Sequence, residues 1–245
     1  MTAVPSALPR RERARAATID EIKRTALDLM RAYGTTDVRF TDIAREMGMT
    51  PPALYRYFDD RDALLTVLIT DAYRDLGQSV AEAQEAVARE DVGGRWRAGA
   101  QAYRRWALND PRRFALIFGL PVPGFCPPEE GETTEAARWA MSQLSNLFVE
   151  AQAAGRLGRP YSCDVDPALA VCAEGKSEDL GVVLPSENFQ AMLHAWAAIH
   201  GFACLEAYGH LDWMTPEGRD ALFVSQVCVS ARAAGLPEPD GPASG

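Results

Sequence analysis

Residues 38–65 read VRFTDIAREMGMTPPALYRYFDDRDALL, and this stretch contains the most specific structural pattern of the chain. Hydrophobic residues recur in it at helical spacing, in two short runs separated by a glycine. The first helix is expected from Thr41 to Gly48, and Thr50 is expected to cap a second helix that runs to about Phe58. Two short helices joined by a tight turn have the proportions of a helix-turn-helix. The residues expected to form its core are Ile43, Ala44, Met47, Leu54 and Phe58.

A longer helix is expected on each side of this stretch. Apolar residues form one helical stripe from Arg13 to Tyr33, and Gly34 follows as a C-terminal stop. Asp60 is expected to cap a fourth helix that starts near Arg61 and continues towards Ala88.

The rest of the chain keeps the helical periodicity, and no stretch shows the alternation typical of a strand. Gly93 and Gly94 are expected to break the chain before a helix from about Arg95 to Leu108. Four prolines and three glycines predict a loop over 119–132. Further helices are expected at 111–118, 134–154, 166–174, 187–208 and 216–234.

The amino-acid composition narrows the possible classes of protein. The chain has 245 residues, 47% hydrophobic and 24% charged, as in ordinary globular proteins. Polar residues interrupt every apolar run, and the N-terminus lacks the apolar core of a secretory signal, so we expect a cytoplasmic protein without a membrane span. The five cysteines form no CxxC pair, and the three histidines are not spaced as metal ligands. No catalytic motif is recognisable, so we expect no metal, no cofactor and no enzyme.

The charge is unevenly distributed. The net charge is −9, but residues 1–65 carry +1 and the remainder carries −10. Arginines at positions 10, 11, 13 and 15 stand against a single glutamate in the first fifteen residues. A locally basic end on an acidic body suits a protein that contacts phosphate with that end alone. We expect a flexible arm over 1–12 that brings Arg10 and Arg11 to DNA, and a merely solvated tail is the alternative.

The outer face of the second short helix carries groups that suit DNA. Tyrosine and arginine can donate to phosphate oxygens, and alanine and proline can lie against thymine methyl groups. Residues 38–65 also resemble the signature of the TetR family of transcriptional regulators, most specifically in Leu54-Tyr55-Arg56-Tyr57-Phe58 and in Arg61-Asp62-Ala63-Leu64. With the preceding helix, the resemblance covers roughly the first quarter of the chain.

The resemblance implies that this segment contacts DNA. The residues expected to do so are Thr41, Thr50, Pro51, Pro52, Ala53, Tyr55, Arg56, Tyr57 and Arg61. Thr41 would touch the DNA backbone, residues 50–53 the base edges, and the two tyrosines the phosphates. Arg61 occupies a position usually held by a phosphate-binding lysine. Two alternatives stay open: Arg56 contacts either a base or a phosphate, and Tyr57 contacts either a phosphate or the hydrophobic core.

A second resemblance lies nearer the C-terminus. Ala195–Gly209, AWAAIHGFACLEAYG, is similar to the Trp–His–Gly (WHG) helix of one C-terminal subclass of the family, and Ala115–Phe125 is similar to another segment of that subclass. In such proteins the last two long helices form a homodimer interface. The helices expected at 187–208 and 216–234 are apolar over most of their circumference, which requires partners on several sides. The expected interface residues are Phe189, Met192, Trp196, His200, Leu222, Phe223 and Val227.

The middle of the chain is rich in aromatic residues. Family analogy places an effector pocket there, for a small molecule expected to be apolar or aromatic. The candidate residues are Trp96, Tyr103, Trp106, Phe114, Phe118, Trp139 and Phe148. Ordinary core packing is the alternative for each of them.

The predicted fold is all-α. It has a helix-turn-helix DNA-binding domain over 13–60, a larger effector-binding and dimerisation domain over 61–234, and a disordered tail over 235–245. The expected function is a homodimeric transcriptional regulator, a repressor that a small-molecule effector releases from a near-palindromic operator in double-stranded DNA. The alternative is a helical ligand-binding or scaffold protein of the same fold without productive DNA binding, which the negative net charge favours slightly.

Overall fold

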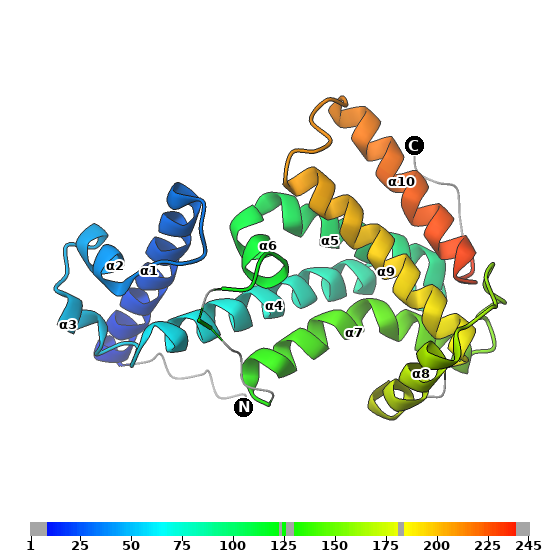
Figure 1. Cartoon of the computed structure of the whole chain (residues 1–245), viewed down its shortest axis with the longest axis horizontal. Helices are drawn as coiled ribbons and strands as arrows, with labels where there is room; N and C mark the ends of the chain where they lie inside the picture. Colours follow the sequence, from blue (N-terminus) through cyan, green and yellow to red (C-terminus); the bar gives the residue numbers. More distant parts are fainter. Residues whose placement is uncertain (1–8, 123, 126–129, 181–183, 239–245) are drawn as a thin grey trace, which may run out of the picture. The chain divides into compact units, whose positions relative to one another are not determined.

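The computed structural model describes residues 9–122, 124–125, 130–180 and 184–238, apart from the side chains of 177–180. Within these ranges it contains helices and no strand (Figure 1), so the all-α prediction is confirmed. The helices are α1 (Arg10–Tyr33), α2 (Phe40–Glu46), α3 (Pro51–Leu54), α4 (Arg61–Glu85), α5 (Val92–Asn109), α6 (Pro111–Phe118), α7 (Glu132–Ala153), α8 (Pro167–Leu180), α9 (Ser186–Ala207) and α10 (Pro216–Ala233).

The chain divides into two compact units. The first unit contains α1, α2, α3, the part of α4 up to Ala72, and the segment Arg112–Thr134. The second unit contains the part of α4 from Tyr73, together with α5, most of α7, α8, α9 and α10. α4 therefore belongs to both units as one continuous helix.

The first unit is a helix-turn-helix domain with the core that its sequence predicts. Ile43, Ala44, Leu54 and Phe58 are buried, and Met47 is half-buried. α1 adds Ile22, Ala26, Leu29 and Met30 to the same side of the unit's core. Gly48 takes a φ of 64°, a left-handed conformation that costs a glycine little, at the turn between α2 and α3.

Three helix boundaries near the DNA-binding motif differ from the prediction. α1 begins at Arg10 rather than Arg13, because arginine, glutamate and alanine are good helix formers and Pro9 precedes them. Arg10 and Arg11 therefore lie in the first turn of a helix, and only residues 1–8 of the predicted arm lie outside the described residues. α2 begins at Phe40, so Thr41 lies inside its first turn and Arg39 holds the cap position.

α3 is shorter than predicted. It ends at Leu54, and residues 55–57 form a tight turn. The amides of Tyr57 and Phe58 both donate to the Leu54 carbonyl, at 2.8 and 3.2 Å. The pattern of apolar residues predicted one helix because a helix and a tight turn place Leu54 and Phe58 on the same side.

The second unit contains three further differences. Asp91 accepts a hydrogen bond from the Gly94 amide at 2.7 Å, so the glycine pair forms the first turn of α5 instead of a break. α8 continues to Leu180, beyond the expected end at residue 174. Leu236 is buried and the Gly158 amide donates to the Gly235 carbonyl at 2.7 Å, so residues 235–238 are packed and not a disordered tail. Residues 239–245 lie outside the described residues.

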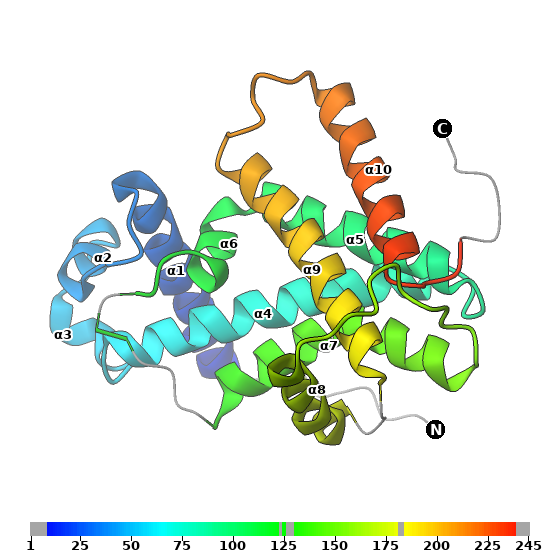
Figure 2. The ribbon, with the colours of Figure 1, turned by 45° about the vertical axis from the view of Figure 1, so that its right-hand side comes forward.

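α5, α9 and α10 pack together in the second unit. Each of these three helices contacts the other two, and Figures 1 and 2 show α8 at the N-terminal end of α9. Arg104 of α5 pairs with the buried Glu206 of α9 and with Asp220 of α10, 2.7 Å away. The largest fully buried side chains of this core include Trp96, Tyr103, Phe148, Ile199 and Phe223. None of the helices in the described ranges is long and apolar enough to cross a membrane.

Candidate DNA-binding surface and ligand pockets

The recognition edge, residues 50–57, is built on one buried anchor. Leu54 is fully buried, and this fixes the position of α3 against α2. Thr50, Pro51 and Pro52 are exposed beside it, and Ala53 is half-buried. Side chains at the start of a recognition helix are those that reach base edges in the major groove. The exposure of Thr50, Pro51 and Pro52 leaves them accessible for such contacts.

Tyr55 and Arg56 extend the exposed part of the recognition edge. The Tyr55 ring centroid lies 5.2 Å from that of Phe40, and 54% of the residue is exposed. Arg56 is exposed as well. Packing on Phe40 orients the tyrosine ring while its hydroxyl end stays available to a phosphate oxygen.

Tyr57 is held by a residue that the sequence analysis did not single out. The Arg15 guanidinium lies 5.1 Å from the centroid of the Tyr57 ring, and its Nη1 donates to the Arg56 carbonyl at 2.9 Å. Tyr57 is half-buried, which accommodates both the packing and the phosphate role predicted for it. In the sequence, Arg15 is one member of a basic run. Its contact with a segment 41 residues away depends on how α1 packs, and no local sequence pattern predicts it.

The Arg61 side chain forms an ion pair and a hydrogen bond within the first unit. Its Nη2 lies 2.8 Å from Asp37 Oδ1, and its Nε donates to the Val38 carbonyl at 3.3 Å. The side chain thus ties the start of α4 to the segment before α2. Asp60 caps α4 as predicted, since its Oδ1 accepts from the Ala63 amide at 2.7 Å.

Ion pairs join the other helices of the first unit to the helix-turn-helix. Lys23 of α1 lies 3.0 Å from Asp71 of α4, and Arg112 of α6 pairs with Asp28 of α1. Partial burial of Lys23 disfavours its charged form, but Asp20 and Asp71 outweigh this and raise the pKa of its ammonium group. α1, the start of α4 and α6 are thereby fixed to one another inside this unit.

The aromatic residues predicted for the effector pocket fall into three groups. Phe114 and Phe118 belong to the first unit, where their ring centroids are 5.3 Å apart. Trp96, Tyr103, Trp106 and Phe148 are buried in the second unit. Their polar atoms have partners: Trp96 Nε1 donates to the Val227 carbonyl at 3.3 Å, Trp106 Nε1 to Asp75 at 2.8 Å, and the Tyr103 hydroxyl lies 2.7 Å from His200 Nδ1. The burial of these four residues and the hydrogen bonds of their polar atoms favour core packing over a role in lining an effector pocket.

Trp139 differs from the other aromatic residues because it is 39% exposed. It lines an open pocket of about 620 Å³ between α7 and α8, together with Ala137, Arg138, Met141, Ser142, Ser145 and Lys176. The Trp139 ring also packs on Gly77 of α4, where a Cβ would lie 2.4 Å from Trp139 Cζ3. This pocket therefore has a wall in contact with α4.

The predicted dimer residues require a correction. Phe189, Met192, Phe223 and Val227 are buried within the chain itself, against helices of the same unit. A helix that is apolar around its circumference needs several partners. α9 and α10 pack on each other and on α5, so most of their apolar surface is covered within the chain. Leu222 is exposed, while Trp196 and His200 are half-buried and stacked with ring centroids 5.2 Å apart.

Among the exposed apolar residues of α9 and α10, only Leu222 belongs to the predicted interface set. They are Leu193, Leu205, Leu222, Val224 and Val229. A groove of about 240 Å³ separates the two helices on the side of Val229, lined by small residues that include Ala195, Ala198 and Ala233. Periodicity alone could not separate this face from the face buried inside the chain.

Comparison with known proteins agrees with these features. Residues 22–68 match the family model described as bacterial regulatory proteins, tetR family, and residues 96–229 match the model of the tetracyclin repressor-like C-terminal domain. The HTH-type transcriptional regulator Rv1816 of Mycobacterium tuberculosis is 30% identical over 213 residues, which cover 85% of this chain and 87% of that protein.

Solved structures share the fold. The crystal structure of the regulatory protein SCO4313 gives a TM-score of 0.69 at 36% sequence identity, covering 91% of this chain and 98% of that one. A tetR family transcription regulator from Shewanella sp. PV-4 gives a TM-score of 0.57 at 17% identity, over 86% of this chain and 96% of that one, a likeness of fold alone. Family models, relatives and fold lead to one conclusion: this chain belongs to the TetR family and is a DNA-binding transcriptional regulator.

Proposed function

We propose that two copies of this chain bind a near-palindromic operator through their recognition edges and release it when a small molecule occupies the second unit. The observation that carries this proposal is the exposure of Thr50, Pro51 and Pro52 beside Tyr55 on the buried anchor Leu54. Thr41, at the exposed start of α2, and Arg10 and Arg11, in the first turn of α1, add contacts to the DNA backbone. Repression with release by the effector is the usual mode in this family.

The two copies pair through α9 and α10. The support is the exposed apolar residues Leu193, Leu222 and Val229, and the groove of small residues between the helices. A self-complementary patch on two packed helices suits a symmetric four-helix interface. The stack of Trp196 on His200, followed by Gly201, also favours the Trp–His–Gly subclass.

The effector binds at the open pocket beside Trp139. Its volume of about 620 Å³ lies within the range of roughly 300–1,000 Å³ that is usual for small-molecule sites. Trp139 supplies an aromatic wall, which suits an apolar or aromatic molecule. A ligand that moves this ring acts directly on α4, because the ring packs on Gly77 without intervening atoms.

α4 then transmits the change to the helix-turn-helix. It is continuous from Gly77 to the part that Lys23 and Asp71 tie to α1, and to Arg61, which fixes the segment before α2. A displacement of α4 in the second unit therefore changes the separation of two recognition edges in the dimer. By linkage, the factor by which the effector weakens operator binding is also the factor by which the operator weakens effector binding.

The site of action is the bacterial cytoplasm, where an operator is accessible, and the chain acts by binding without a chemical step. A gel-shift titration with the DNA upstream of the chain's own coding sequence tests this, with a shuffled duplex of equal length as the control. Specific binding of one dimer is expected. Equal affinity for both duplexes would instead support the alternative function, a ligand-binding or scaffold protein of this fold.

A further inference from the structure

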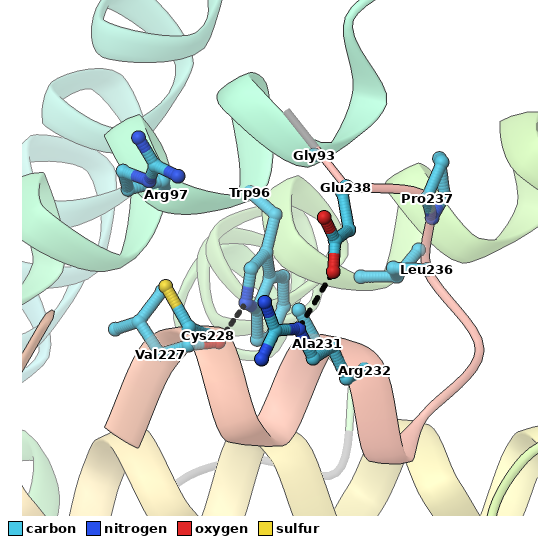
Figure 3. Close-up of a pocket in the computed structure, with 10 residues that line it drawn as sticks. All are labelled: Gly93, Trp96, Arg97, Val227, Cys228, Ala231, Arg232, Leu236, Pro237 and Glu238. Carbon is cyan, nitrogen blue, oxygen red and sulfur yellow. Dashed lines mark hydrogen bonds and ion pairs between the residues drawn. The ribbon is translucent and has the colours of Figure 1, made fainter. Parts of the chain in front are cut away.

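A second pocket lies where the N-terminal part of α5 meets the C-terminal part of α10 (Figure 3). Its volume is about 210 Å³. The residues that line it are Gly93, Trp96, Arg97, Val227, Cys228, Ala231, Arg232, Leu236, Pro237 and Glu238. It shares no lining residue with the pocket beside Trp139, and it lies on different helices.

One wall of this pocket is apolar and fixed in place. The Trp96 ring is buried, and its Nε1 donates to the Val227 carbonyl at 3.3 Å. The Phe148 ring supports it edge-on, with the centroids 5.7 Å apart and an interplanar angle of 86°. Leu236 and Pro237 face the same space from the chain's last described segment. An apolar ligand group would meet this wall without rearrangement.

Arg97 brings a buried donor without an acceptor to the pocket. The residue is half-buried, and its Nε atom is buried with no hydrogen-bond partner among the described residues. A buried donor of a charged group that lacks an acceptor is costly to the folded state. The other two charges of the lining, Arg232 and Glu238, neutralise each other at 2.7 Å. Figure 3 shows that pair on the other side of Trp96 from Arg97.

We propose that this pocket binds a small organic carboxylate with an apolar body, its carboxylate on Arg97 and its body against Trp96. A carboxylate matches the guanidinium in shape and can accept two of its hydrogen bonds. One negative charge balances the single charge of Arg97, because Arg232 and Glu238 already neutralise each other, whereas a dianion would leave one charge uncompensated in the pocket. The volume lies below the range of roughly 300–1,000 Å³ for drug-sized ligands, so a one-ring or short-chain acid fits. This goes beyond the proposed function, which places the effector beside Trp139.

The test uses benzoate as the probe and benzamide as its neutral counterpart of the same shape. Isothermal titration of the full chain should show binding of benzoate and at least about tenfold weaker binding of benzamide, because only the acid forms charge-assisted hydrogen bonds. Arg97→Gln should weaken benzoate binding by a similar factor. Arg105→Gln, an exposed arginine of the same helix, should leave it unchanged.

Two of the free cysteines, Cys228 and Cys172, allow the bound probe to be located. Cys228 lines the pocket, whereas Cys172 is exposed on α8 and lines none of the described pockets. Benzoate should slow alkylation of Cys228 by iodoacetamide, measured by mass spectrometry, and leave Cys172 unaffected. Protection should be lost in Arg97→Gln.

Three results would overturn the proposal. They are equal binding of benzoate and benzamide, benzoate binding that survives Arg97→Gln, and binding that leaves Cys228 unprotected. A chain ended after Glu238 should bind benzoate as the full chain does; markedly tighter binding would mean that the chain's own last residues occupy the pocket, and would also refute it. None of these measurements involves DNA, so their failure is distinct from failure of operator binding.

Discussion

At the scale of single residues, Tyr55 combines two roles in one side chain. Its ring packs on Phe40, and 54% of the residue is exposed on the recognition edge. Alanine at this position would remove both roles and confuse a lost DNA contact with a loosened helix-turn-helix. Phenylalanine keeps the packing and removes only the group that can donate to a phosphate.

Tyr55→Phe should therefore weaken operator binding while the thermal unfolding midpoint stays the same. One hydrogen bond is worth about 0.5–1.5 kcal/mol, and a dimer loses two, so a loss of roughly five- to a hundredfold is expected. Fluorescence anisotropy with labelled operator measures it. Tyr33→Phe, on a tyrosine that is also about half exposed in the first unit, is the control and should change nothing. Unaltered affinity in Tyr55→Phe would remove this hydroxyl from the interface.

His200 is a second residue whose surroundings determine its behaviour. Its Nδ1 lies 2.7 Å from the Tyr103 hydroxyl and its Nε2 lies 3.4 Å from Cys204 Sγ, with Trp196 stacked on the ring. Burial lowers the pKa of His200 below its ordinary value, and burial raises the pKa of Tyr103. The structure therefore holds a neutral imidazole between two neutral partners, which suits a structural residue in the core.

The lowered pKa predicts how stability depends on pH. The unfolded chain takes up the proton near the ordinary pKa of about 6.5, but the folded chain does so only at lower pH. Stability from this residue is thus present above that value and is lost as pH falls through it. The urea midpoint should fall between about pH 7.5 and about pH 5.5, and fall less in His200→Asn. His210→Asn, at an exposed histidine, should retain the full fall; equal behaviour of the two variants would contradict the assignment.

At the scale of elements, sequence periodicity predicts helices well because it is a local property. The helix-turn-helix, the buried positions of its core and the ends of α6, α9 and α10 follow from spacing and from Gly or Pro signals. The spacing of apolar residues does not show what an apolar helix face packs against. Phe223 and Val229 look alike in sequence, yet one is fully buried inside the chain and the other is 56% exposed. The contacts of Arg15 with Arg56 and of Arg61 with Asp37 could not be predicted either, because each joins segments that are far apart in the sequence.

The turn between α2 and α3 depends on the left-handed conformation of Gly48. A residue with a Cβ in that conformation costs roughly 1–2 kcal/mol, although no neighbouring atom obstructs the Cβ itself. Gly48→Ala should lower stability by that amount, measured by urea denaturation. Gly175→Ala is the matched control, because Gly175 is exposed inside α8 with open space around it, and it should gain about 0.5–1 kcal/mol. Equal effects of the two would contradict this account of the turn.

In the proposed dimer, pairing of the two copies depends on the exposed face of α10. Val229→Glu should convert the dimer into monomers, because it places a charge in an apolar contact that excludes water. Analytical ultracentrifugation at micromolar concentration measures this. Val171→Glu, at an exposed valine of α8, should remain dimeric. A Val229→Glu protein that stays dimeric would move the interface away from this face. Phe223→Glu is unsuitable as a test, because Phe223 lies in the core of the chain.

At the scale of the whole molecule, the distribution of charge and the symmetry of the proposed dimer both favour binding to an operator with two half-sites. Residues 1–65 carry a net charge of +1, while the rest of the chain carries −10 and is repelled by DNA. A chain of this kind has one end that can approach phosphates, and a symmetric pair presents two such ends. Two recognition edges related by a twofold axis require two half-sites of opposite orientation.

Symmetric binding of this kind can be tested by a hydroxyl-radical footprint on the DNA upstream of the coding sequence. We expect two symmetric protected patches, with half-site centres about one helical turn apart, roughly 34–36 Å, or slightly more. Both patches should appear together as protein is added, and in Tyr55→Phe both should require roughly five- to a hundredfold more protein. A single patch without a symmetric counterpart, or protection that Tyr55→Phe leaves unchanged, would contradict it.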